Sequence, residues 1–146
     1  MPTYRTLIQT PAEPAAVFAY LSRFDRAAEW DPGVARAEMV TDEPVGLGSR
    51  FRLVARFLGR SLPLEYEIID FVAPERVVLR AETGALRSTD TITFGAEGSG
   101  TLVLYEAVLE AKGWARFTDL VLAVALRRIG DRAAKGLRER LRSVPR

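Results

Sequence analysis

Residues 114–141 constrain the fold most, because their apolar residues recur with helical spacing over many turns. On a wheel of about 100° per residue, one side carries an unbroken apolar stripe within about 40° of a single line. The stripe consists of Leu122, Leu126, Ile129, Ala133 and Leu137. Because such a helix is stabilised mainly by packing its apolar side, we expect the rest of the chain to form a large apolar surface.

The middle of the chain alternates apolar and polar residues with the period of two that is typical of half-buried β-strands. We predict strands at residues 4–9, 34–41, 51–57, 62–68, 77–82, 88–94 and 103–110.

Opposed residues of antiparallel strands must share a face, which tests these strands against one another. A turn at residues 58–61 places Leu53 opposite Tyr66, and the last hairpin places Ile92 opposite Tyr105. One register satisfies every hairpin, so we predict a meander with one apolar and one more polar face.

Two short helices, residues 15–21 and 24–29, are predicted between the first two strands. The turn Trp30-Asp31-Pro32-Gly33 ends the second, since Pro and Gly stop a helix. The order of elements indicates an α+β fold, and residues 1–146 fit one domain whose sheet curls around the C-terminal helix.

The composition excludes several kinds of chemistry. The chain has neither cysteine nor histidine. Thiolate catalysis, disulfides, His-based triads and the usual transition-metal sites are therefore excluded, and we predict no cofactor and no metal. No nucleotide-binding loop or aromatic–basic motif points to nucleic acid.

Two observations concern membranes and location. Residues 1–10 are polar and lack the apolar core of a signal peptide. The longest apolar run, residues 120–126, is far shorter than the ~20 residues that a membrane span needs. We therefore expect a cytoplasmic protein.

Four motifs spread over nearly the whole chain carry a family resemblance. They are Pro14-Ala15-Ala16-Val17-Phe18 after the first strand, the corner Trp30-Asp31-Pro32-Gly33-Val34, the glycine turn at residues 45–51, and Gly98-Ser99-Gly100-Thr101 before the last strand. In this order they resemble the helix-grip or START-like superfamily (Bet v 1-like, SRPBCC), which includes polyketide cyclase/dehydrase and lipid-transport proteins.

The resemblance implies a seven-stranded antiparallel sheet that grips the long helix, with a hydrophobic cavity between them. Members use this cavity to carry lipids, to bind hormones or aromatic metabolites, or to cyclise and dehydrate polyketides. These motifs are structural, so they do not choose among the functions.

Asp90 is the most informative polar residue of the predicted inner face, because its cross-strand neighbours Leu79 and Ala107 are apolar. Burial of a carboxylate costs several kcal/mol unless it is paired, and it raises the pKa. Beside the phenol of Tyr105, such an acid would suit proton transfer next to a carbonyl, so both are candidate catalytic residues. Alternatively, Asp90 pairs with an arginine or lies near solvent at the rim of the sheet.

The residues expected to line a ligand cavity come from the sheet, its corner and the helix. They are Trp30, Phe51, Leu53, Tyr66, Ile68, Leu79, Ser88, Asp90, Ile92, Tyr105, Ala107, Leu122, Leu126 and Ile129. Gly130, inside the long helix, either makes room for a ligand or allows a strand to approach closely.

The opposite side of the long helix begins with apolar residues and continues with basic ones. The apolar residues are Phe117, Leu120, Val121 and Val124, and Arg128 begins the basic line. This side packs against the N-terminal helices or the loops at the cavity mouth, or it forms a homodimer contact, or it touches an anionic membrane transiently.

Three functions are consistent with the sequence. The first is binding or transport of a hydrophobic small molecule (a lipid, polyketide or aromatic metabolite), oriented by Tyr66, Asp90 and Tyr105. The second is a polyketide cyclase/dehydrase-type enzyme that uses Asp90 and Tyr105. The third is an interaction module that docks through its C-terminal helix.

Overall fold

The computed structural model describes residues 1–57, 59–113 and 119–144, and its elements follow the predicted order. They are β1 (Thr3–Thr10), α1 (Pro14–Ser22), the 3-10 helix η1 (Phe24–Glu29), β2 (Val34–Met39), β3 (Arg50–Phe57), β4 (Arg60–Val72), β5 (Arg76–Glu82), β6 (Leu86–Glu97), β7 (Gly100–Ala111) and α2 (Asp119–Leu141).

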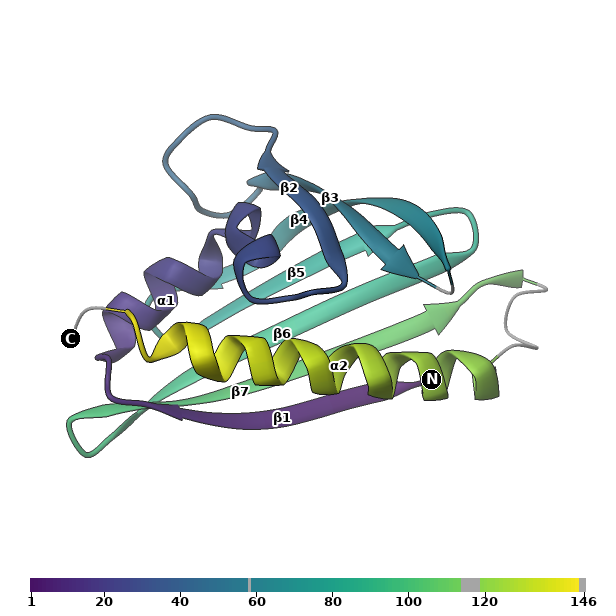
Figure 1. The fold of residues 1–146 in the computed structure, drawn as a ribbon. Coiled ribbons are helices and arrows are strands. Elements are labelled where there is room, and N and C mark those ends of the chain that lie inside the picture. The colour runs from purple at the N-terminus through teal and green to yellow at the C-terminus, as the bar shows by residue number, and fades with distance from the viewer. Residues whose placement is uncertain (58, 114–118, 145–146) are drawn as a thin grey trace.

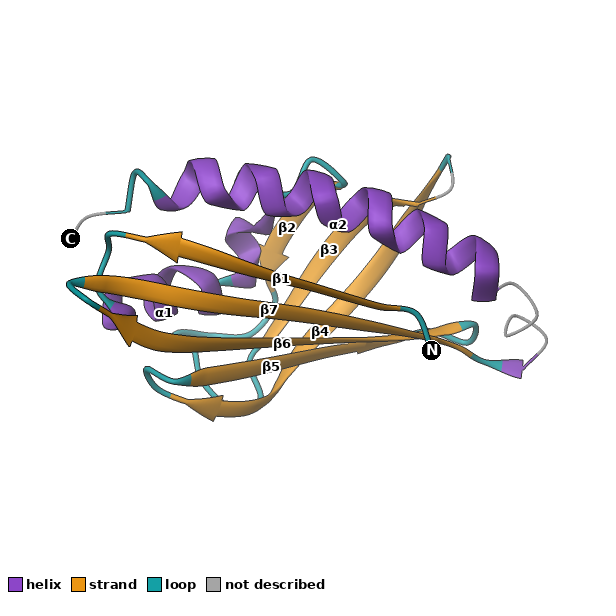
Figure 2. Cartoon of the chain, turned by 90° about the horizontal axis from the view of Figure 1, so that it is seen from below, coloured by secondary structure: helices purple, strands orange, loops and turns teal. Residues whose placement is uncertain are grey.

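The strands form one antiparallel sheet in the order β1-β7-β6-β5-β4-β3-β2, so β2 to β7 are a meander and β1 pairs with β7. The sheet curls, and α2 lies along its concave side (Figures 1 and 2). This is the predicted α+β architecture of a sheet that grips a long helix.

The predicted hairpin registers are confirmed for β5 to β7, where Leu79 pairs with Asp90 and Ile92 with Tyr105. The register predicted for β3 and β4 is wrong by two residues. Leu53 pairs with Leu64, and Tyr66 with Phe51.

The cause of the β3–β4 difference is a shorter turn than the one predicted. Pairing continues to Phe57 and Arg60, which leaves two residues between the strands, and Gly59 adopts the positive φ (76°) that such tight turns favour. Because the shift is an even number of residues, every side chain stays on its predicted face.

α2 presents its predicted apolar stripe to the sheet. Leu122 and Leu137 are buried, and the stripe residues between them are partly buried. Residues 114–118, including Phe117, lie outside the described part of the chain. In the described ranges no helix is both long and apolar enough to cross a membrane.

The opposite side of α2 is exposed rather than packed against the N-terminal helices. Leu120 is 81% exposed, and Val121 and Val124 are each 54% exposed. Packing of these three residues against the N-terminal helices is therefore wrong, because α1 and η1 lie elsewhere along the sheet (Figure 1).

The concave side of the sheet is divided between a packed core and a cavity. Phe18 of α1 packs edge-on against Phe71 and Phe94, with ring centroids 5.1 and 5.2 Å apart, and fills one end. The other end faces η1 and the middle of α2, where the side chains leave space.

Candidate functional site

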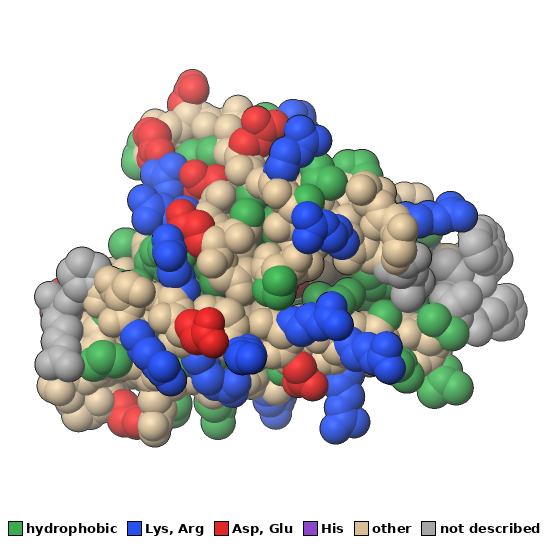
Figure 3. Space-filling model, in the orientation of Figure 1, with side chains coloured by type: hydrophobic (Ala, Val, Ile, Leu, Met, Phe, Trp, Pro, Cys, Tyr) green, Lys and Arg blue, Asp and Glu red, His purple; other side chains and the backbone are tan. Residues whose placement is uncertain are grey.

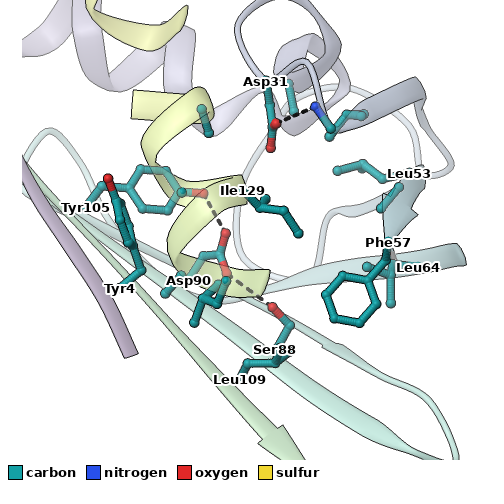
Figure 4. Close-up of a pocket in the computed structure, with 18 of the residues that line it drawn as sticks. Tyr4, Asp31, Leu53, Phe57, Leu64, Ser88, Asp90, Tyr105, Leu109 and Ile129 are labelled. Carbon is teal, nitrogen blue, oxygen red and sulfur yellow. Dashed lines mark hydrogen bonds between the residues drawn. The ribbon is translucent and has the colours of Figure 1, made fainter. Parts of the chain in front are cut away.

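The cavity lies between the sheet, the η1–β2 corner and α2. Its volume is about 150 Å³. Its described lining is mostly apolar and comes from the strands, the two helices beside them and the corner between η1 and β2 (Figure 4): Tyr4, Thr6, Phe24, Ala27, Trp30, Asp31, Gly33, Val34, Leu53, Ala55, Arg56, Phe57, Leu62, Leu64, Tyr66, Leu86, Ser88, Asp90, Tyr105, Ala107, Leu109, Leu126, Ile129, Gly130, Ala133, Ala134 and Leu137.

The residues expected to line a cavity divide into two groups. Those that line this one are Trp30, Leu53, Tyr66, Ser88, Asp90, Tyr105, Ala107, Leu126 and Ile129. Those buried elsewhere are Phe51, Ile68, Leu79, Ile92 and Leu122. Alternation predicts the face of a strand but not the position along it, and α1 covers the end of the sheet next to Ile92.

Asp90 lies at the centre of a polar group on β4, β6 and β7. The hydroxyl of Tyr105 donates to its Oδ2 (2.5 Å), and the hydroxyl of Ser88 donates weakly to its Oδ1 (3.4 Å). The hydroxyl of Tyr66 donates to Ser88 Oγ (2.9 Å). Asp90 is 7% exposed, so the expected alternatives of an arginine partner or a solvated rim position are wrong.

Burial dominates the protonation equilibria of this group. It raises the pKa of Asp90 to about 6, although hydrogen bonds from Tyr105 and Ser88 oppose the rise. Burial and the negative charge of Asp90 also raise the pKa values of Tyr105 and Tyr66 above the ordinary range. An acid that exchanges a proton near neutral pH beside a protonated phenol could serve general acid–base chemistry.

Four aromatic rings, two of them the tyrosines of the polar group, contact one another in a row. The rings of Tyr66 and Phe24 lie 5.1 Å apart, those of Phe24 and Trp30 6.4 Å, and those of Trp30 and Tyr105 5.9 Å, all edge-to-face. Trp30 is buried beneath the corner of the fold and lines the cavity, as expected from the sequence.

Asp31 is a cavity residue that the sequence did not single out. Its Oδ1 accepts a hydrogen bond from the backbone N–H of Gly33 (2.8 Å), as an aspartate before a Pro-Gly turn commonly does. Burial raises its pKa to about 6. In the sequence it belongs to a turn motif, and only its place next to Trp30 hinted at an inward position.

Tyr4 is a second lining residue that the sequence did not single out. Its hydroxyl donates to Asp131 of α2 (2.8 Å), and burial followed by this hydrogen bond raises its pKa to about 12. A Cβ on Gly130 would lie 2.6 Å from the Tyr4 ring. Gly130 therefore allows β1 to approach α2, the second of its two predicted roles.

A groove with a more open shape adjoins the cavity and shares Arg56 and Ile129 with it. We call it the mouth groove. It lies between the β3–β4 hairpin and the first half of α2, and its volume is about 690 Å³. It is lined by Arg56, Gly59, Leu120, Val121, Val124, Ala125, Arg128, Ile129 and Arg132. Figure 3 shows a hollow in this face with Lys and Arg side chains gathered beside it.

A metal site would need several carboxylates together. Among the described residues, no group of three or more acidic side chains is placed to hold a metal ion.

The curled sheet, the long helix on its concave side and the cavity between them define a helix-grip fold. The chain belongs to the polyketide cyclase / dehydrase and lipid transport family, whose sequence model matches residues 1–142. No curated protein matches it significantly.

Several solved structures are similar to this one. A START superfamily protein from Mycobacterium smegmatis is 14% identical, with a TM-score of 0.78 over 95% of this chain and 96% of that one. The protein TTHA0849 from Thermus thermophilus is 24% identical, with a TM-score of 0.76 over 96% and 97%. The di-domain ARO/CYC StfQ from the steffimycin biosynthetic pathway is 19% identical, with a TM-score of 0.70 over 95% of this chain and 48% of that one. At these identities the similarity shows the fold.

Proposed function

We propose that this protein binds a hydrophobic small molecule in the cavity between its sheet and α2. The observation that carries the proposal is the cavity, which has a volume of about 150 Å³ and a mostly apolar lining. Protein interiors pack as densely as organic crystals and rarely leave voids larger than a water molecule. An apolar space of this size is therefore unfavourable unless a ligand fills it.

Affinity and orientation would come from different residues. Burial of apolar ligand surface contributes roughly 25 cal/mol per Å² before the losses of association are subtracted. The polar group of Tyr66, Asp90 and Tyr105 lies at one side of the apolar lining and would fix the orientation of the ligand.

A fluorescent probe tests the proposal. N-phenyl-1-naphthylamine is neutral and fluoresces more strongly when it leaves water. We expect it to bind with a Kd in the micromolar range, which corresponds to roughly 8 kcal/mol. Ala107→Phe would place a ring in the cavity next to Asp90 and should weaken binding at least about tenfold.

Leu7→Phe is the matched control, because Leu7 is 57% exposed on the outer side of β1. This variant should bind the probe like the wild type. Absence of binding to the wild type at micromolar concentrations, or equal binding by both variants, would contradict a ligand role for the cavity.

A second candidate function is catalysis of the cyclase/dehydrase type. The short hydrogen bond from Tyr105 to Asp90 favours it, since it joins an acid of raised pKa to a phenol inside the cavity. The fold similarity to an ARO/CYC di-domain also makes this class of reaction worth testing. If this second candidate is the function, a polyketide-type carbonyl substrate turns over with the wild type but not with Asp90→Asn or Tyr105→Phe, with both variants folded. Turnover retained in both would exclude these residues as the acid–base pair.

We also propose that the mouth groove touches an anionic lipid surface. Leu120, Val121 and Val124 are exposed beside Arg56 and Arg128, and none of the described residues that line the groove is acidic. Apolar side chains that enter a membrane beside arginines that meet phosphates are typical of peripheral binding. A twofold homodimer through the same patch would instead bring like charges together.

Sedimentation with vesicles tests the lipid contact. We expect binding to vesicles that contain an anionic lipid at low salt, with weaker binding at high salt and to neutral vesicles. Leu120→Ser with Val124→Ser should reduce it. Concentration-dependent dimerisation without vesicle binding would support the homodimer instead. The cytoplasmic location stays a prediction from the sequence.

A further inference from the structure

The cavity contains two carboxyl groups, Asp31 and Asp90, that lie on different elements. In Figure 4 both side chains point into the same space from opposite sides. Among the lining residues that the structure describes, Arg56 is the one basic side chain, and its guanidinium donates to the carbonyl oxygen of Pro32 (3.3 Å) at the exposed rim. Neither carboxyl group therefore has a cationic partner among the described cavity residues.

The hydroxyl protons near Asp90 are already engaged. Tyr105 and Ser88 direct theirs to the carboxyl group of Asp90, and Tyr66 directs its own to Ser88. These three hydroxyls therefore present lone pairs, rather than protons, to a molecule in the cavity. On the other side, Asp31 accepts from the Gly33 backbone with Oδ1, and its Oδ2 accepts nothing from the described residues.

Burial raises the pKa values of both carboxyl groups to about 6, which is still far below the pKa of about 10 of an alkyl amine, so an amine bound beside them would hold the proton. Ionised carboxylates in an apolar cavity are unfavourable unless a positive charge or hydrogen-bond donors compensate them. A ligand is one source of that compensation.

The aromatic rings around Asp90 fit the same kind of ligand. Trp30 and Tyr105 meet edge-to-face, as do Phe24 and Tyr66, and all four line the cavity. Aromatic faces attract a cation through the negative charge of their π-systems, most strongly where water is excluded.

We propose that the ligand of this cavity is a hydrophobic amine that binds as its protonated form, with the ammonium group between Asp31 and Asp90 and against the aromatic rings. The inference rests on the proposed function and names the class of ligand. A carboxylate ligand would meet repulsion from both aspartates, and a ketone would find no free hydroxyl donor among Tyr66, Ser88 and Tyr105.

Three molecules that share a ring and a two-carbon chain test this inference at pH 7.5. Phenethylamine is a cation, 2-phenylethanol is neutral and phenylacetate is an anion. By calorimetry we expect phenethylamine to bind roughly ten- to a hundredfold more tightly than 2-phenylethanol, because charge-assisted hydrogen bonds are the stronger ones. Phenylacetate should bind more weakly than both.

Substitutions of the two aspartates test whether they cause the preference for the amine over the alcohol. Asp31→Asn and Asp90→Asn should each reduce the advantage of the amine over the alcohol at least several-fold. Asp70→Asn is the control, because this carboxylate pairs with Arg76 outside the cavity (2.6 Å) and should not alter the preference.

The outcomes separate this inference from the proposed function. If 2-phenylethanol or phenylacetate binds the wild type as tightly as phenethylamine, the cavity binds small molecules but does not select cations, and only the inference is wrong. If Asp31→Asn and Asp90→Asn both prefer phenethylamine to 2-phenylethanol as strongly as the wild type does, the cavity selects cations but the ammonium site between the two aspartates is wrong. If none of the three molecules binds and the naphthylamine probe does not bind either, the proposed function is wrong as well.

Discussion

At the scale of single residues, Asp90 should make the stability of the protein depend on pH. The unfolded chain releases its proton near the ordinary pKa of 3.8 and the folded protein only near 6. Between these values the unfolded state holds fewer protons, so the free energy of unfolding falls as pH rises, and the stability is greatest below about pH 4 for this group. Asp31 acts in the same direction.

Asp90→Asn should therefore reduce the fall in the free energy of unfolding between pH 4 and pH 7. At roughly 1.4 kcal/mol per unit, the difference in free energy of unfolding between variant and wild type should change by up to about 3 kcal/mol from pH 4 to pH 7. Urea titrations at both pH values measure it. The same pH dependence in both proteins would mean that Asp90 is not buried as described.

Tyr105→Phe leaves Asp90 Oδ2 without its hydroxyl donor. We expect a loss of about 1–3 kcal/mol in free energy of unfolding at pH 7, with a smaller loss at pH 4, where the carboxyl group is protonated. Tyr20→Phe is the control, since the Tyr20 hydroxyl donates to Glu29 at the surface (2.8 Å). Equal losses in the two variants would show that the buried hydrogen bond stabilises the protein no more than the surface one.

How far the sequence predicts single residues depends on their setting. Alternation placed Asp90 between Leu79 and Ala107, because a strand leaves two choices of face and apolar neighbours decide between them. Asp31 has no such periodicity around it. Its direction depends on the turn and on Gly33, so the second carboxyl group of the cavity became visible only in the structure.

At the scale of elements, the close approach of α2 to the η1–β2 corner requires Gly136. A Cβ at this position would overlap the carbonyl oxygen of Trp30, which is backbone and cannot move freely. An exposed helical Gly→Ala change stabilises by about 1 kcal/mol. Gly136→Ala should instead destabilise by roughly 1–3 kcal/mol through overpacking.

Thermal or urea unfolding of Gly136→Ala and Gly130→Ala gives the comparison. The atoms nearest to a Cβ added to Gly130 belong to the Tyr4 side chain, 2.6 Å away, rather than to backbone, so Gly130→Ala should destabilise less. A stabilised Gly136→Ala would contradict the packing of α2 on the corner.

The elements themselves were predictable from the sequence to differing degrees. The meander and the face of each strand follow from alternation, which an even shift of register leaves intact, as β3 and β4 show. The length of the turn between them depended on Gly59 adopting a positive φ, which the pattern of apolar residues does not encode. The stripe on α2 was predicted because helical periodicity over many turns leaves one side to bury.

At the scale of the whole molecule, the position of the cavity follows from how the helices share the concave side. α1 brings Phe18 onto Phe94 and closes one end, whereas η1 and α2 leave the other end open around Asp90. The sequence predicts one apolar side for the sheet, but the division of that side depends on where the short helices lie. That is why Ile92 and Ile68 belong to the packed core and Ser88 to the cavity.

We propose above all that this cavity holds a hydrophobic molecule. The most direct measurement is mass spectrometry of the compounds extracted from protein purified under native conditions, for the wild type, Ala107→Phe and Leu7→Phe. We expect one hydrophobic compound, an amine if Asp31 and Asp90 bind an ammonium group, in near-stoichiometric amount from the wild type and Leu7→Phe and little from Ala107→Phe. No compound from any of the three, or equal amounts from all, would contradict the account.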